Sequence, residues 1–173
     1  MIYEYIPHKD PRQATGLLVI CLSAAVGFFT FPAMFQDMPL RWLFQLTGVA
    51  FLAAVIFVYT RYIAKSFIYR VEEREDGAAF TVIEVTSNGR SRVAVCCFAL
   101  SSIEEAHRLS LDDADKKKAL GSKAKREGRR VFDFCPDAST PDVAYLFVEE
   151  NGDRFLVKVA TDQRLFSYFA RED

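Results

Sequence analysis

Charged residues are almost missing from residues 14–60. This stretch contains only Asp37 and Arg41, although Asp, Glu, Lys and Arg make up 26% of the 173-residue sequence. The overall composition, 51% hydrophobic with a net charge of −1, excludes a disordered chain and averages two different segments. One segment has the composition of a membrane protein and the other that of a soluble domain.

The sequence also has little of what most catalytic sites need. It holds two histidines, and none of its eight glycines lies in a phosphate-binding pattern such as G-x-G-x-x-G or G-x-x-x-x-G-K. Glu104 and Glu105 are adjacent, and neighbours on a strand point to opposite faces, so we interpret them as solvated charge rather than as an acid–base pair. We expect no catalytic residues, no cofactor and no enzymatic activity.

The four cysteines show no metal-binding or redox spacing. Cys96 and Cys97 are adjacent on a predicted strand, whereas Cys21 lies in an apolar run and Cys135 is isolated. We interpret all four as reduced packing residues. The alternative is a small membrane enzyme, or a thiol-redox or metal protein, that uses Cys97, Cys135 and His107.

Two uncharged runs, residues 14–35 and 42–60, are long and apolar enough to span a bilayer as helices. A cleaved signal peptide is the rival interpretation of the first run. The run is too long for a signal peptide and does not end in a small-x-small cleavage site. We therefore predict an N-terminal tail and a transmembrane helical hairpin within residues 1–65. No Asp, Glu, Lys, Arg or His lies inside either span, which argues against an autonomous transporter.

The short connection, residues 36–41, makes the two helices antiparallel neighbours. Lysine and arginine near the helix ends concentrate on the cytoplasmic side of membranes. Five basic residues lie before the first helix or after the second, and one lies in the connection; they are Lys9, Arg12, Arg61, Lys65 and Arg70, and Arg41 in the connection. Both chain ends are therefore predicted to be cytoplasmic and the connection external. The sequence thus predicts a multi-pass membrane protein with both termini in the cytoplasm.

Small residues four positions apart give each helix one face for close packing. They are Ser23 and Gly27 in the first span, and Ala50 and Ala54 in the second. We expect these faces to pack the hairpin against itself. The alternative is that they pair with another chain, which would make the protein a homo-oligomer or part of a complex.

Residues 66–173 have the texture of a mostly β domain. Strand patterns cover residues 67–71, 80–85, 93–100, 131–135, 143–148 and 155–159, with a further short strand or turn around residues 102–109. Asn88-Gly89 and Asn151-Gly152 lie between apolar runs and predict two hairpin turns. With 17 basic and 20 acidic residues, the segment carries no basic field of the kind that binds nucleic acid.

A C-terminal helix is predicted after Thr161 or Asp162, either of which can cap it. Leu165, Phe166 and Phe169 fall at helical spacing and form its apolar stripe. Four strands, a long excursion, three strands and a closing helix resemble a pleckstrin-homology-like domain. Preceded by two membrane helices, the chain resembles bacterial membrane proteins that carry such a domain.

The resemblance implies about seven antiparallel strands in two sheets and a capping helix. It also implies a membrane-attached interaction or scaffolding module without catalysis. Members of the wider fold that bind phosphoinositides use basic residues around the first hairpin. Here residues 72–76 read Glu-Glu-Arg-Glu-Asp, so no binding residue is carried over.

A polar segment, residues 111–130, interrupts the strands and carries eight basic residues. We interpret it as an exposed loop or solvated helix without core residues. Because each basic residue near an anionic surface contributes about 1 kcal/mol, it is also a candidate for contact with lipid or an acidic partner. The candidates are Lys116, Lys117, Lys118, Lys123, Lys125, Arg126, Arg129 and Arg130. The sequence as a whole indicates a membrane-anchored protein that presents a cytoplasmic domain to a partner protein or to the membrane surface.

Overall fold

The computed structural model describes residues 3–9, 11–34, 41–75, 77–86, 89, 91–137 and 140–170. The chain divides into two compact units. One is helical and extends over residues 10–65. The other is a mostly β unit that combines the N-terminal residues before the helices with residues 66–173. We describe each unit by itself.

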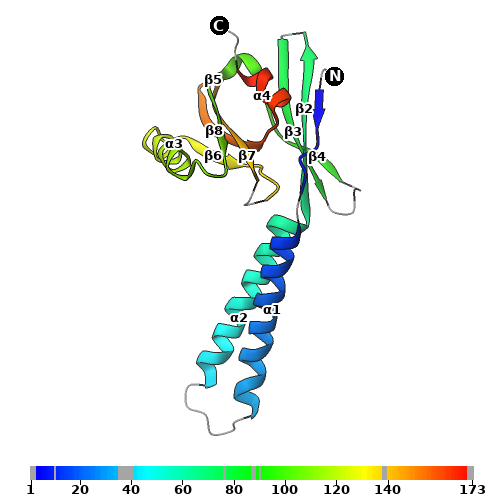
Figure 1. Ribbon diagram of the computed structural model, residues 1–173, viewed down its shortest axis with the longest axis vertical. Coiled ribbons are helices and arrows are strands. Elements are labelled where there is room, and N and C mark those ends of the chain that lie inside the picture. Colours follow the sequence, from blue (N-terminus) through cyan, green and yellow to red (C-terminus); the bar gives the residue numbers. More distant parts are fainter. Residues whose placement is uncertain are drawn as a thin grey trace. The chain divides into compact units, whose positions relative to one another are not determined.

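The helical unit contains α1 (Pro11–Met34), α2 (Arg41–Val58) and a short π-helical turn (Tyr59–Ile63). Ala14–Met34 and Arg41–Ile63 are both long and apolar enough to cross a membrane. The two helices lie side by side (Figure 1). Pro32 is within the last turn of α1, where its missing N–H leaves the middle of the helix intact. Most of the connection, residues 35–40, lies outside the described residues.

The two helices pack through residues other than those expected. Cys21 and Ala25 of α1 and Gly48 of α2 are buried, and the Phe28 ring stacks on Phe51 with ring centroids 5.6 Å apart. A Cβ atom at Gly48 would lie 2.9 Å from the Phe29 ring, so only glycine permits this approach.

The small residues of α1 are not buried against α2. Ser23 and Gly27 are exposed, and a Cβ at Gly27 would meet nothing within 4 Å. On α2, Ala54 is half-buried and Ala50 is exposed. The expectation that the Ser23 and Gly27 face packs the hairpin against itself is therefore wrong.

The first sheet of the β unit has the order β1-β2-β3-β4. Its strands are β1 (Tyr3–Tyr5), β2 (Lys65–Arg74), β3 (Gly77–Thr86) and β4 (Arg92–Ala99). β1 pairs antiparallel with β2, Glu4 opposite Arg70. These residues were predicted to form an N-terminal tail of the membrane segment, whereas they are an edge strand of the β unit. They were missed because three residues are too few to show a strand period.

The second sheet has the order β5-β7-β8-β6. Its strands are β5 (Ile103–Ser110), β6 (Arg130–Asp133), β7 (Asp142–Glu150) and β8 (Asp153–Ala160), and a 3₁₀ turn (Leu100–Ser102) precedes β5. The expected strand near residues 102–109 is therefore β5, and it belongs to the second sheet rather than the first. β6 runs parallel to β8, so the expectation of antiparallel strands throughout is wrong for this pair, and the unit has eight strands rather than about seven.

The turn between β7 and β8 confirms one predicted hairpin. Asn151 and Gly152 both have positive φ, 53° and 84°, as a type I′ turn requires. In the other predicted turn, Asn88 lies outside the described residues, while Gly89 has a φ of 64°.

The C-terminal helix α4 (Gln163–Phe169) begins where predicted, since the Asp162 carboxylate accepts a hydrogen bond of 2.6 Å from the Leu165 amide. Strands of both sheets contribute buried residues to one hydrophobic cluster, which we call the main core. Leu165 and Phe169 are buried in it, and Phe166 is half-buried at its margin. The ring of Phe169 meets that of Phe80 edge-on at 5.0 Å, which joins α4 to β3.

Candidate interaction surface

Most of the polar segment folds into helix α3 (Ala114–Arg126). The helix ends in a Schellman motif around Gly128, whose φ is 66°. The amide of Gly128 donates to the Lys125 carbonyl at 3.2 Å, and that of Arg129 donates to Ala124 at 2.9 Å. Basic residues fill the last turn, where they complement the helix dipole. The prediction of a helix, one of the two alternatives, is confirmed.

α3 packs on the outer face of the second sheet (Figure 1). Ala124 is fully buried and Leu120 packs beside it, against a cluster formed by β5, β7 and β8; its members are Leu109, Cys135, Val143, Tyr145, Phe147 and Leu156. The expectation that residues 111–130 lack core residues is therefore wrong.

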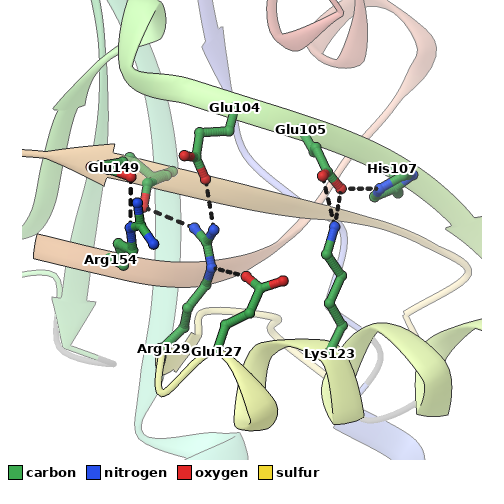
Figure 2. A network of polar contacts seen from close by, with 9 residues as sticks. Glu104, Glu105, His107, Lys123, Glu127, Arg129, Glu149 and Arg154 are labelled. Carbon is green, nitrogen blue, oxygen red and sulfur yellow. Dashed lines mark hydrogen bonds and ion pairs between the residues drawn. The ribbon is translucent and has the colours of Figure 1, made fainter.

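Ion pairs with glutamates of β5 also hold the α3 segment on the sheet (Figure 2). The Lys123 ammonium lies 2.6 Å from a Glu105 oxygen, and the Arg129 guanidinium lies 2.7 Å from Glu104. Arg129 also binds Glu127 at 2.6 Å, and its side chain is only 7% exposed. Both basic groups lie over the Phe147 ring, at 4.8 Å for Lys123 and 5.2 Å for Arg129.

A β-bulge explains why both adjacent glutamates take part. The β5–β7 register shifts between Ile103 and Glu105, which makes Glu104 the extra residue. Glu104 and Glu105 are both exposed and both reach toward the α3 segment (Figure 2). The expectation that they face opposite ways is wrong, because alternation along a strand fails at a bulge.

Hydrogen bonds within this network shift the pKa values of Glu105 and Arg129. Hydrogen bonds from Lys123 and then from His107 lower the pKa of Glu105. Burial lowers the pKa of Arg129, but its hydrogen bonds with Glu127 and Glu104 outweigh burial and raise it. Glu105 and Arg129 are therefore charged at neutral pH, and we call the network of ion pairs the clamp of α3.

The eight basic candidates differ in their exposure and in whether they form ion pairs. Lys123 and Arg129 belong to the clamp, and Lys116 lies 3.0 Å from Asp113. Lys117 is half-buried. The remaining four are exposed, and the described residues offer their side chains no hydrogen bond or ion pair; they are Lys118, Lys125, Arg126 and Arg130. We call Lys118, Lys125 and Arg126 the basic face of α3.

A hollow of about 470 Å³ begins just beyond the end of α3, where Glu127 and Gly128 form part of its wall. Phe132 and Phe155 form its apolar part, and Gly128 and Gly152 line it at two turns. Arg130, Arg154, Glu127 and Asp153 line it with charge. Within this set Arg154 binds Glu149 at 2.7 Å and Glu127 binds Arg129. The hollow could not be predicted from the sequence because its residues come from two separate segments, 127–132 and 152–155.

The alternative thiol or metal site is not assembled. His107 is on β5 and Cys135 follows β6, which are opposite edges of the second sheet, while Cys97 is on β4 of the first. No group of three or more His, Cys, Asp or Glu residues that could hold a metal occurs in the described part of the chain.

The thiols differ in exposure. Cys97 is exposed, Cys96 is half-buried against the main core, and Cys21 and Cys135 are buried. The neighbouring cysteines thus do face opposite sides of the strand, as predicted. Burial, with a smaller contribution from Cys97, raises the pKa of Cys96 to about 11, so this thiol is protonated and unreactive at neutral pH.

Comparison with protein-family models, curated proteins and solved structures gave no match for this sequence.

Proposed function

We propose that this chain is a membrane-anchored interaction protein. In this proposal α1 and α2 span a bacterial inner membrane with both ends in the cytoplasm, and a pleckstrin-homology-like β unit contacts a partner protein or the membrane surface. The observation that carries the proposal is the basic face of α3. Its three cations are exposed and have no ion pair with any described residue, whereas Lys123 and Arg129 on the same segment pair with glutamates of the β unit.

The pairing of β1 with β2 supports a hairpin topology. β1 precedes α1 and β2 follows α2, yet the two strands are hydrogen-bonded neighbours in one sheet. If both helices cross a membrane, the start of α1 and the end of α2 must therefore lie on the same side. The excess of basic residues at these ends favours the cytoplasm.

Cysteine labelling tests the orientation. In a cysteine-free variant that carries Asp37→Cys, a membrane-impermeant reagent should label intact cells, and a cysteine added at the C-terminus should react only after permeabilisation. The reverse pattern would overturn the orientation.

Lysine acetylation tests the basic face on the full chain in nanodiscs. If the face binds lipid, Lys118 and Lys125 should react more slowly in anionic than in neutral nanodiscs, and added salt should abolish the difference because it screens surface charge within about 8 Å at physiological strength. Lys123 is an internal control, since Glu105 already binds its ammonium.

If the face binds protein, acetylation should not depend on the lipid, and a photo-crosslinker at position 118 should yield one discrete adduct in cells. The same crosslinker at Arg74, an exposed residue of β2, is the control. The proposed function is refuted if the lysines are not protected in anionic nanodiscs and no crosslinked adduct forms in cells.

A further inference from the structure

The two sheets have four edge strands, and three of them are blunted. β1 has only three residues. β4 carries a bulge at Val95, and the Glu150 carboxylate accepts a hydrogen bond of 3.2 Å from its Ala99 amide. β5 carries the bulge at Glu104. Short strands and bulges are the usual means by which proteins prevent edge-to-edge pairing.

The fourth edge, β6, is also short, with four residues, but it has no bulge. Its four residues pair in unbroken parallel register with β8, and the sheet ends there. Its two apolar side chains are open to solvent, Val131 at 48% and Phe132 at 39% exposure. An uninterrupted edge with exposed apolar side chains is a template for an added strand.

The backbone of Val131 points away from the sheet. In a parallel pair, alternate residues of a strand bond to the neighbour. The Phe134 amide donates to the Lys158 carbonyl of β8 at 2.9 Å, which assigns the even-numbered residues to β8. The N–H and C=O of Val131 therefore face outward and are available to another chain.

The surroundings of β6 indicate what such a chain would contain. On one face, Phe132 and Phe155 meet edge-on at 5.8 Å and form the apolar part of the hollow. Its volume of about 470 Å³ lies within the usual range of ligand pockets, roughly 300–1,000 Å³. Arg130 lies at the start of the strand, and Lys125 and Arg126 end the helix just before it.

We propose that β6 binds an extended segment of a partner protein by strand addition, and that this segment alternates apolar with acidic residues. An apolar side chain would fill the hollow beside Phe132 and Phe155. The acidic side chains would face Arg130, which lines the hollow and has no ion pair with any described residue, and Lys125 and Arg126 at the end of α3 would add positive charge nearby along the chain. This inference rests on the proposed role as an interaction protein and names its class of partner.

Fluorescence anisotropy on the full chain in neutral nanodiscs tests the proposal. The probe is a short capped peptide in which glutamate alternates with phenylalanine and valine. It should bind, and added salt should weaken binding because the contacts are exposed ion pairs. The same peptide with alternate backbone amides methylated cannot form the ladder and should bind at least about tenfold more weakly, a loss of about 1.4 kcal/mol.

Val131→Pro provides the matching change in the protein. Proline removes the outward N–H and is tolerated on a free edge. It should weaken peptide binding about tenfold or more, whereas the control Val131→Ala keeps the N–H and should change binding far less. Phe132→Ala, which empties one wall of the hollow, is a second variant should Val131→Pro fail to fold.

Equal binding of the methylated and unmethylated peptides, or no binding of either, would overturn strand addition. Anionic nanodiscs that protect Lys118 and Lys125 while the peptide fails to bind would leave the proposed function standing with lipid as the ligand. Peptide binding without any lipid protection would support both proposals.

Discussion

The phenol of Tyr69 on β2 donates a hydrogen bond of 2.8 Å to the carbonyl of Phe134, which follows β6 in the other sheet. The same oxygen accepts a hydrogen bond of 3.3 Å from the Ala160 amide at the end of β8. Tyr69 is completely buried, so water cannot replace these two hydrogen bonds of its hydroxyl group. One oxygen atom therefore links the two sheets through the core.

Tyr69→Phe should destabilise the β unit by about 1–3 kcal/mol, because it leaves a buried carbonyl and amide without their partner. Chemical denaturation of the full chain in detergent, followed by near-ultraviolet circular dichroism, measures the change. Tyr168→Phe is the matched control, since it deletes the same atom from a half-buried ring whose hydroxyl makes no hydrogen bond within the described residues. Equal effects of both variants would contradict the assigned role.

Alkaline pH should destabilise the β unit. Burial raises the pKa of Cys96 from 9.0 to about 11 and raises that of Tyr69 well above 10. Above about pH 9 the unfolded chain releases protons that the folded chain retains, so the free energy of unfolding falls as pH rises. Denaturation from pH 8 to pH 11 should show this decline, and Cys96→Ala should make it shallower. A flat profile would show that neither group titrates differently on folding.

Arg129→Met should cost about 1–3 kcal/mol, because it leaves Glu104 and Glu127 without the guanidinium that both bind. Hydrogen exchange should accelerate in α3, since the clamp is lost. Arg126→Met is the control. It removes an exposed cation with no partner, so it should change stability by no more than about 0.5 kcal/mol. A similar loss in both variants would mean that net charge matters rather than the pairing.

Thiol reactivity should follow burial. In the native chain at neutral pH, Cys97 should react first with a small maleimide, and Cys135 should be protected until unfolding. Cys96 should react slowly, and its rate should rise as pH approaches about 11. Single-cysteine variants followed by mass spectrometry separate the rates. Rapid reaction of Cys135 at neutral pH would revive the thiol-redox alternative.

Local sequence signals predicted local structure well. Asn151-Gly152 requires two positive φ values and forms the expected turn, and Asp162 caps α4 because its side chain reaches the Leu165 amide. The two apolar helices follow from the missing charges. Each of these features depends on neighbouring residues alone, which is why a single sequence reveals it.

Features that depend on distant partners were not predicted. β1 is recognisable only once β2 is beside it, and β6 gives no sign in its own residues that its neighbour β8 runs parallel. The bulge at Glu104 reversed the expected direction of a carboxylate. Ala124 gave no hydrophobic signal, yet it is completely buried because a small residue lets α3 approach the sheet.

The pairing of β1 with β2 also sets an order of events during synthesis. Residues 3–5 leave the ribosome before either helix, but their partners, residues 69–71, follow both. If α1 and α2 span a membrane as proposed, the first sheet can be completed only after both helices have been made and the ends that carry β1 and β2 lie in one compartment. A chain that stranded one helix on the wrong side would lack β1 and the Tyr3 hydrogen bond to Asp162, and proteases could recognise it by its unfinished sheet.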